Sequence, residues 1–268
     1  MDRIHSAIAK ARASRESADP VRQAVQTTPT QRSTGTANWA NLPEFQISDQ
    51  AFDTNHIVAH RADRAATAFD MMRSTLLHNL HHHNWTRVAV TSPDASCGKT
   101  TVTLNLAFSL ARMSDMRVMV LELDFRRPGM LRALGFDRSL NFSAVLTEAQ
   151  SPEAQLIRCG TNLAFGLSTT PVQSPAELLS SVCAADVVDR IEAAYRPDVM
   201  LFDMPPMSAG DDTLAFLDQV DCALMVAAAE ETSASMIDQC GKDLAKRTQV
   251  LGVVLNKCRM VDPNDMYS

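Results

Sequence analysis

The chain has 268 residues, of which 46% are hydrophobic, and a formal net charge of −6. This composition supports the core of one medium-sized domain, and the acidic balance argues against general nucleic-acid binding. No apolar run approaches the ~20 residues that span a bilayer, no signal peptide is visible, and the six cysteines form no C-x-x-C pair, so we expect a cytoplasmic protein with reduced thiols.

The first segments of the chain differ in composition from the rest. Residues 1–18 place small apolar side chains along one helical stripe beside basic ones, which fits a partner-docking helix, a membrane-surface helix or, as we favour, a solvated helix. Residues 20–55 are rich in Thr, Gln, Ser, Asn and Pro and predict an extended or disordered linker. We therefore divide the chain into an N-terminal helix and flexible linker (1–60), one domain (61–260) and a short tail (261–268).

An amphipathic helix is expected next. Residues 65–80 carry apolar side chains at three- or four-residue spacing. The helix ends in His78, His81, His82 and His83, a run that could bind a metal or form an exposed polar turn. We favour the turn and predict no metal site there.

Residues 87–101, RVAVTSPDASCGKTT, predict a strand, a polar loop and the start of a helix. A loop around a polyphosphate points backbone N–H groups inward, and the helix that follows favours an anion at its N-terminus. Lys99 would then reach the terminal phosphates and the Thr100 hydroxyl would bind Mg²⁺. The match to G-x-x-x-x-G-K-[ST] is incomplete, because Pro93 replaces the first glycine. The alternative is a simple helix start in which Gly98 supplies the turn and the lysine is solvated.

Cys97 lies within this loop, close to the N-terminus of a helix, where its thiol could become reactive. We favour the simpler interpretation that the loop needs a small residue there. The residues expected to line the nucleotide are Ser96, Cys97, Gly98, Lys99, Thr100 and Thr101.

Two further apolar runs, residues 118–124 and 199–203, end on carboxylates. In an open α/β sheet the ligand lies outside the carboxyl ends of the strands, so Asp124 and Asp203 can face the phosphates and their metal. The alternative is that both are only polar strand terminators. Because three strand ends would converge on one point, we favour the site.

The rest of the chain alternates between helical and strand patterns. Ser174-Pro175-Ala176-Glu177 resembles a capping box with proline at the first helical position, and predicts a helix running towards Cys183. The other expected elements are a crossover helix within 141–158, a strand at 163–167, helices at 182–194 and 234–247, and strands at 222–227 and 250–255. This alternation predicts one α/β unit with a doubly wound, mostly parallel sheet.

The order of these motifs resembles the bacterial tyrosine kinases of capsule and exopolysaccharide assembly, which belong to the same P-loop NTPase branch as the partition and septum-site ATPases. The resemblance covers residues 64–258. Arg126-Arg127-Pro128 and Asp203-Met204-Pro205-Pro206 favour the kinase group. Asp94 favours it too, because it stands where the partition group usually carries a second lysine.

The resemblance implies phosphoryl transfer from MgATP, in which the protein mainly positions groups and neutralises charge. Lys99 would stabilise the β- and γ-phosphates, while Thr100, Asp124 and Asp203 would hold Mg²⁺ directly or through its waters. Two further residues of the implied catalytic set are Glu122, which replaces the family's first aspartate as the group that positions or deprotonates the attacking hydroxyl, and Arg126, a charge stabiliser or the partner of a nearby carboxylate. Asn256 matches the position beside the adenine.

The resemblance also implies a membrane polysaccharide co-polymerase as partner, recruitment to the inner face of the plasma membrane and a possible homo-oligomer. The family's ring-forming helix motif is altered here, because Thr67 and Asp70 replace a glutamate and an arginine and only Arg73 remains. Tyr195 precedes a strand and is expected to be packed, which leaves Tyr267 as the autophosphorylation candidate. The alternatives are a partition- or localisation-type ATPase switch and a nucleotide-binding regulator without kinase activity.

Overall fold

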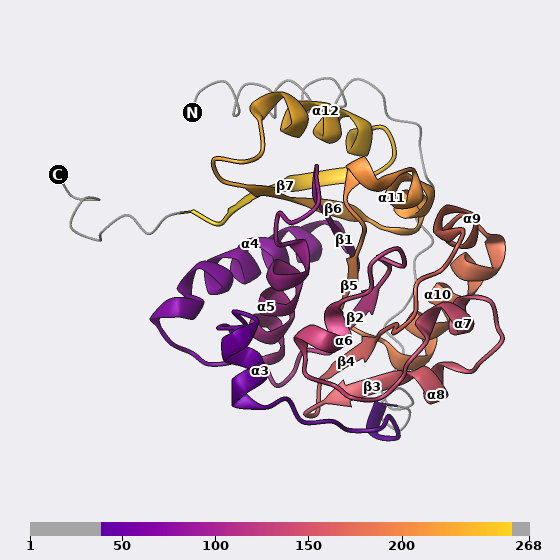
Figure 1. Ribbon diagram of the computed structural model, residues 1–268. Coiled ribbons are helices and arrows are strands. Elements are labelled where there is room, and N and C mark those ends of the chain that lie inside the picture. The colour runs from indigo at the N-terminus through magenta and orange to yellow at the C-terminus, as the bar shows by residue number, and fades with distance from the viewer. Residues whose placement is uncertain (1–38, 259–268) are drawn as a thin grey trace.

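The computed structural model describes residues 39–258, which form a seven-stranded sheet with helices on both faces (Figure 1). The strand order is β3-β4-β2-β5-β1-β6-β7, and every neighbouring pair is parallel except β3 with β4. The predicted doubly wound, mostly parallel sheet is therefore confirmed. The predicted N-terminal helix (1–18) and Tyr267 lie outside the described residues.

The strands that were expected from the sequence are present, with bounds that differ by no more than two residues at either end, and β3 is additional. They are β1 (Arg87–Thr91), β2 (Val118–Glu122), β3 (Leu156–Cys159), β4 (Leu163–Gly166), β5 (Val199–Asp203), β6 (Cys222–Ala228) and β7 (Gln249–Asn256).

The helices vary widely in length, and the short ones lie mostly between β2 and β6. They are α3 (Asp49–Thr54), α4 (Thr67–His83), α5 (Lys99–Ala111), α6 (Met130–Ala133), α7 (Phe142–Leu146), α8 (Pro152–Gln155), α9 (Pro175–Leu179), α10 (Val182–Tyr195), α11 (Asp212–Phe216) and α12 (Ala234–Ala245), with 3₁₀ turns η1 (Arg64–Ala66), η2 (Met207–Ala209) and η3 (Leu217–Gln219). Within residues 39–258, no helix has the length and apolarity needed to cross a membrane.

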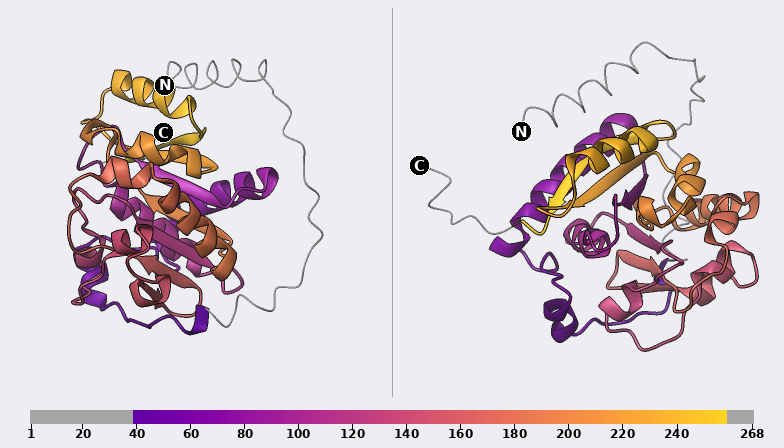
Figure 2. Two further views of the ribbon diagram at one scale, coloured as in Figure 1. Left: turned by 90° about the vertical axis from the view of Figure 1, so that its right-hand side faces the viewer. Right: turned by 45° about the horizontal axis from the view of Figure 1, so that its top comes forward.

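Alternate residues of the central strands belong to two apolar clusters, one on each face of the sheet. On β2, Met119 and Leu121 belong to one cluster, and Val118 and Val120 belong to the other. Successive side chains of a strand point to opposite faces, so a strand covered on both sides is a continuous apolar run. The views in Figure 2 show helices on both sides of the sheet. The covering layers fix the strands and hold the polar residues at their carboxyl ends in place.

The crossover helix predicted within residues 141–158 is wrong. The structure has two short helices, α7 and α8, followed by β3, which runs antiparallel to β4. On its other side, β3 exchanges hydrogen bonds with residues 43–45: the Arg158 amide donates to the Pro43 carbonyl at 2.8 Å, and the Phe45 amide donates to the Arg158 carbonyl at 2.9 Å. β3 pairs with its sequence neighbour β4 on one side, whereas its partners on the other side come from a distant part of the chain.

The linker predicted for residues 20–55 is also wrong over residues 39–55. Trp39, Leu42 and Phe45 are only 3%, 2% and 7% exposed, and α3 follows them. The Trp39 ring packs edge-on against Tyr195, with ring centroids 6.2 Å apart. Few apolar residues are needed here because the hydrophobic surface that they contact is supplied by the folded domain. Tyr195 itself is 1% exposed, as its expected packing role requires.

The helix predicted to start at Ser174 is present as α9, but it ends at Leu179 and Ser174 makes no side-chain capping bond. A separate helix, α10, begins after Ser181, whose hydroxyl accepts a hydrogen bond from the Ala184 amide at 3.1 Å. A serine that caps the next helix allows the chain to change direction at this point.

Helix α4 is held against α5 by polar contacts within the chain. Asp70 accepts a hydrogen bond from the Ser109 hydroxyl at 2.6 Å and forms an ion pair with Arg112. Arg73 donates to the Ser109 carbonyl at 2.8 Å. Residues that correspond to the family's ring-forming motif are therefore used here for packing one helix of the domain on another. The four histidines at the end of α4 are exposed.

Candidate functional site

The loop between β1 and α5 turns sharply at Ser96 and Gly98, where φ is +63° and +84°. Glycine adopts this left-handed region readily, whereas other residues are rarely found there. A Cβ atom at Gly98 would lie only 2.2 Å from Nδ2 of Asn256, so a side chain at this position would also collide. The close fit places the loop over the N-terminus of α5, where free N–H groups and the helix dipole favour an anion.

Asn256 secures this loop from the end of β7. Its Nδ2 donates to the Cys97 carbonyl at 2.9 Å. The Cys97 side chain is 3% exposed and lies 3.6 Å from the Thr232 hydroxyl, measured from Sγ to Oγ1. Such packing is what the small-residue interpretation of Cys97 predicts. Ser96, in contrast, is exposed at the outer side of the loop.

Lys99 is the first residue of α5 and points to the end of β2. Its Nζ atom donates to Oδ2 of Asp124 at 2.8 Å, and the two side chains are 13% and 8% exposed. Burial lowers the pKa of Lys99, but the charges of Asp203 and Asp124 outweigh it and hold this pKa above its ordinary value. The lysine is therefore a fixed positive charge beside two carboxylates.

The next residue, Thr100, joins α5 to the end of β5. Its hydroxyl donates to Oδ2 of Asp203 at 2.7 Å, and the Thr103 hydroxyl lies 3.4 Å from Oδ1 of the same carboxylate. Asp203 is 1% exposed. Burial is the largest influence on its pKa and raises it, against the opposing effect of the Lys99 charge. A cation placed beside Asp203 would favour the ionised carboxylate.

Glu122 is the last residue of β2 and is 1% exposed. Its Oε1 accepts hydrogen bonds from the amides of Gly129 and Met130 at 2.7 and 2.8 Å, and its Oε2 accepts one from the amide of Ser168 at 3.1 Å. Burial is the main cause that raises the pKa of Glu122 to about 7, while these amides oppose the rise. Glu122 thus ties the loop after β2 to the loop after β4.

Arg126 forms an ion pair instead of facing the loop freely. Its Nε and Nη2 atoms donate to the two carboxylate oxygens of Asp212 at 2.5 and 2.9 Å. Asp212 is 1% exposed, whereas Arg126 is 41% exposed. The sequence left two roles open for Arg126. In the structure, Arg126 pairs with a neighbouring carboxylate.

Two site residues were not predicted from the sequence. Thr103 follows Thr100 by three positions on α5, and this helical spacing could have placed both on the Asp203 side. Asp212 lies 86 positions from Arg126, and no local pattern links them. The structure brings together Lys99 with Asp124 and Thr100 with Asp203, as predicted for convergent strand ends.

These side chains fit a nucleotide with Mg²⁺. Magnesium is usually held by one or two carboxylates together with waters and substrate phosphates. The hydroxyl of Thr100 and the carboxylates of Asp203 and Asp124 supply oxygen ligands, and the N-terminus of α5 beside them favours the phosphates. Within residues 39–258, no group of three or more His, Cys, Asp or Glu side chains is arranged to hold a metal by itself.

A Gly-Lys-Thr loop after β1, with carboxylates at the ends of β2 and β5 of a parallel sheet, defines a P-loop NTPase. The ParA family model, described as NUBPL iron-transfer P-loop NTPase, matches residues 85–267. Tyrosine-protein kinase CpsD of Streptococcus pneumoniae serotype 4 is 30% identical over 176 residues, 63% of this chain and 75% of that protein. The chain belongs to the bacterial tyrosine kinase family within the ParA and MinD type of P-loop NTPases.

Other relatives give the same family. Tyrosine-protein kinase YwqD of Bacillus subtilis is 27% identical over 171 residues, which is 63% of this chain and 71% of that protein. A longer relative from Ralstonia nicotianae is 27% identical over 242 residues, 86% of this chain but only 31% of that protein. The chain therefore spans about a third of the length of some relatives and most of the length of others.

Solved structures support the fold. The chimerical protein CapA2B2 has a TM-score of 0.68 at 20% identity, covering 82% of this chain and 94% of that one. The kinase domain of the Escherichia coli tyrosine kinase ETK has a TM-score of 0.66 at 21% identity, covering 75% and 80%. The septum site-determining protein MinD of Pyrococcus horikoshii, complexed with Mg-ADP, has a TM-score of 0.55 at 18% identity, covering 67% and 75%.

Proposed function

We propose that this protein is an ATP-dependent protein tyrosine kinase of capsule or exopolysaccharide assembly. The single observation that carries the proposal is the convergence of Lys99 on Asp124 and of Thr100 on Asp203, at 2.8 and 2.7 Å. A P-loop lysine, a metal-binding hydroxyl and two carboxylates are the groups that phosphoryl transfer requires. Membership of the tyrosine kinase family directs this chemistry to a tyrosine hydroxyl.

Each residue then has a defined task. MgATP, when bound, supplies the phosphoryl group. Lys99 would bind phosphate oxygens and neutralise their charge. Thr100 and Asp203 would hold Mg²⁺, and Asp124 would hold the ion directly or through a water molecule. The N–H groups of the loop around Gly98 bind phosphate oxygens.

The geometry supports a positioning role for Glu122. The sequence made this residue the candidate that orients or deprotonates the acceptor hydroxyl. The two carboxylate oxygens of Glu122, however, already accept three backbone N–H bonds. A general base needs a free oxygen within hydrogen-bonding reach of the proton that it removes from the acceptor hydroxyl. We therefore assign Glu122 to holding the loop that carries Asp124 and Arg126.

The biological setting is proposed from the family alone. We expect a cytoplasmic protein that a membrane polysaccharide co-polymerase recruits to the inner face of the plasma membrane. The Ralstonia relative, of which this chain spans 31%, supports a domain that works together with further protein segments. A homo-oligomer is part of the same proposal, although Asp70 and Arg73 are engaged within the chain.

A second candidate is a localisation-type ATPase switch that dimerises on ATP. The similarity of this chain's fold to that of MinD complexed with Mg-ADP favours this candidate. A third candidate, a regulator that binds nucleotide without turnover, is favoured by the replacement of the family's first aspartate by Glu122. The three candidates differ in their products: phosphotyrosine, free phosphate alone, or neither.

To test the proposal, the wild-type protein and the Lys99→Met and Tyr267→Phe variants are incubated with MgATP, with and without membranes from the source cell. Phosphotyrosine and free phosphate are measured in parallel. Lys242→Met, at an exposed position on α12, is the matched control. Phosphotyrosine that disappears in both test variants establishes a kinase that modifies Tyr267, and phosphotyrosine on membrane proteins that persists in Tyr267→Phe establishes other acceptors. Free phosphate without phosphotyrosine, lost only in Lys99→Met, would sink the kinase proposal.

A further inference from the structure

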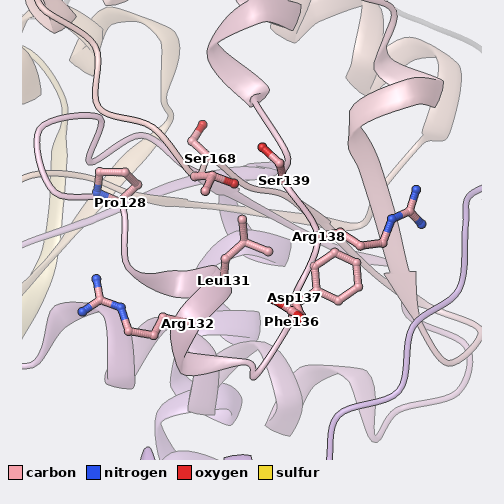
Figure 3. A pocket seen from close by; sticks show the side chains of 9 residues that line it. Pro128, Leu131, Arg132, Phe136, Asp137, Arg138, Ser139 and Ser168 are labelled. Atoms are coloured by element: carbon pink, nitrogen blue, oxygen red, sulfur yellow. The ribbon is translucent and has the colours of Figure 1, made fainter.

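A cavity of about 300 Å³ lies beside the loop that follows β2. Its floor is apolar and consists of Pro128, Leu131 and Phe136. Figure 3 shows Leu131 at the centre, with Arg132 and Arg138 on opposite sides. The volume is at the lower end of the range for ligand pockets and suits one ring-sized group.

The rim of the cavity carries positive charge although the chain is acidic overall. Arg132 and Arg138 face a single carboxylate, Asp137, among the lining residues, whereas the whole chain has a net charge of −6. Within residues 39–258, neither arginine forms an ion pair or a side-chain hydrogen bond. Arginine pairs strongly with carboxylates, so the rim fits an acidic ligand.

The wall of the cavity contains a buried hydroxyl that has no hydrogen-bond partner. The Ser168 side chain lines the cavity, is 1% exposed, and its Oγ atom contacts no donor or acceptor among the described residues. An unsatisfied buried hydroxyl is energetically unfavourable, and a ligand with a polar atom would remove this penalty. Ser168 therefore contributes an unused hydrogen-bonding group to the wall of the cavity.

The cavity adjoins the loop after β2, which also carries Asp124. Pro128 follows Asp124 by four positions, and Glu122 links the two walls, since it binds the amides of Gly129 and Met130 on one side and the amide of Ser168 on the other. A peptide held in the cavity would therefore pass close to the loop that carries Asp124. The cavity follows β2 and β4, whereas Asn256, which secures the loop before α5, ends β7 at the other edge of the sheet.

We propose that this cavity docks the acceptor peptide, with an aromatic side chain on the apolar floor and acidic residues against Arg132 and Arg138. The proposal rests on the proposed kinase function, because it names the class of substrate for that site. The segment 261–268, VDPNDMYS, combines two aspartates with Tyr267 and supplies a probe of this chemistry.

The experiment measures binding of a fluorescently labelled VDPNDMYS peptide to the full chain by anisotropy, without ATP. Arg132→Glu combined with Arg138→Glu is expected to weaken binding of the peptide at least tenfold. A peptide with both aspartates replaced by lysine is expected to bind this double variant more tightly than it binds the wild-type protein. Lys246→Glu, at an exposed residue just after α12, is the control and should bind the peptide normally. ATP affinity is measured in parallel, so that a loss confined to the peptide is recognised.

Ser168→Ala separates a ligand role from a packing role. Removal of an unsatisfied buried hydroxyl should leave the melting temperature unchanged or raise it, whereas peptide binding should weaken several-fold. A peptide with alanine in place of Tyr267 should likewise bind more weakly.

The proposal fails if the wild type does not bind the peptide, if the charge-reversed variant binds it normally, or if the alanine peptide binds as well as the tyrosine peptide. Peptide binding that depends on both arginines, in a protein that forms no phosphotyrosine, would retain the docking cavity and reject the kinase function. Phosphotyrosine formation that is unaffected by the charge reversal would retain the kinase function and reject the docking cavity.

Discussion

Two neighbouring regions at the carboxyl edge of the sheet satisfy their buried carboxylates in different ways. In the phosphate-loop region, Asp124 and Asp203 bind side chains of α5, Lys99 and Thr100. In the region beyond β2, Glu122 binds only backbone amides, those of Gly129, Met130 and Ser168. All of these carboxylates are at least nine-tenths buried, yet only the first two have partners that can move without the backbone moving.

The difference teaches which groups are available for chemistry. A side-chain pair such as Lys99 with Asp124 can exchange partners when an anion and a metal enter, because a rotamer change is sufficient. A carboxylate bound by three amides can exchange partners only if two loops shift. The contacts of the first region can therefore rearrange around a ligand, whereas those of the second region hold the loops around it in place.

Lys99→Met should have the largest effect. We expect ATP turnover to fall about 100-fold or more, because one positioned charge at a developing negative charge contributes that much to the rate. Steady-state phosphate release measures the effect, and Lys242→Met serves as the control. An undiminished rate in Lys99→Met would show that the side-chain pairs in the first region do not take part in the chemistry.

Glu122 should contribute to the pH dependence of stability, in the same direction as Asp203, whose pKa is also raised by burial. Its pKa is raised from 4.5 to about 7 in the folded protein, so at pH values between these the unfolded state is ionised while the folded state retains the proton. The contribution of Glu122 to the free energy of unfolding is therefore present in full below pH 4.5 and falls, by roughly 3 kcal/mol at most, as the pH rises to 7. Urea unfolding at several pH values gives the free energy of unfolding as a function of pH. The slope of this dependence should be shallower for Glu122→Gln than for the wild type.

The exposed Glu177→Gln variant is the control for that experiment and should retain the wild-type slope. Equal slopes for Glu122→Gln and the wild type would mean that Glu122 is already ionised in the folded protein at low pH. The contrast between the two regions would then rest on geometry alone.

Gly98→Ala tests the fit between the phosphate loop and β7. The substitution forces a side chain into the left-handed region at φ +84° and places a Cβ 2.2 Å from Asn256, so we expect a loss of about 2 kcal/mol in stability and about tenfold weaker ATP binding. Gly241→Ala on α12 is the matched control. Its Cβ meets only Met225 at 3.8 Å, and alanine in a helix should stabilise by up to about 1 kcal/mol. Calorimetry with ATP measures both effects, and similar results for the two variants would contradict the proposed fit.

Thr100→Val and Thr103→Val should separate metal binding from packing, with the smallest effects. Both hydroxyls approach Asp203, at 2.7 and 3.4 Å, but only Thr100 is a predicted Mg²⁺ ligand. Thr103→Val should lower stability by about 1 kcal/mol, as expected for one hydrogen bond, and leave the Mg²⁺ dependence of ATP binding intact. Thr100→Val should weaken that Mg²⁺ dependence, and titration with Mg²⁺ at fixed ATP provides the measurement. If both variants respond alike, Thr100 is not the metal ligand.

The sequence by itself determined the elements whose signals are local. The strand at β1, the Gly98-Lys99-Thr100 turn and the carboxylates that end β2 and β5 could be predicted, because a parallel sheet brings the carboxyl ends of its strands to one edge. The mostly parallel sheet also followed from the alternation of buried apolar runs with helical patterns.

Only the tertiary structure decided the contacts between distant segments. Strand β3 pairs with residues 43–45, Trp39 packs on Tyr195, Arg126 pairs with Asp212, and Glu122 binds backbone amides of two loops. A residue's own sequence neighbourhood does not reveal which distant group will satisfy its hydrogen bonds or cover its apolar surface. That choice depends on how the sheet and its helices bring the segments together, and it gave Asp124 and Asp203 side-chain partners and Glu122 backbone partners.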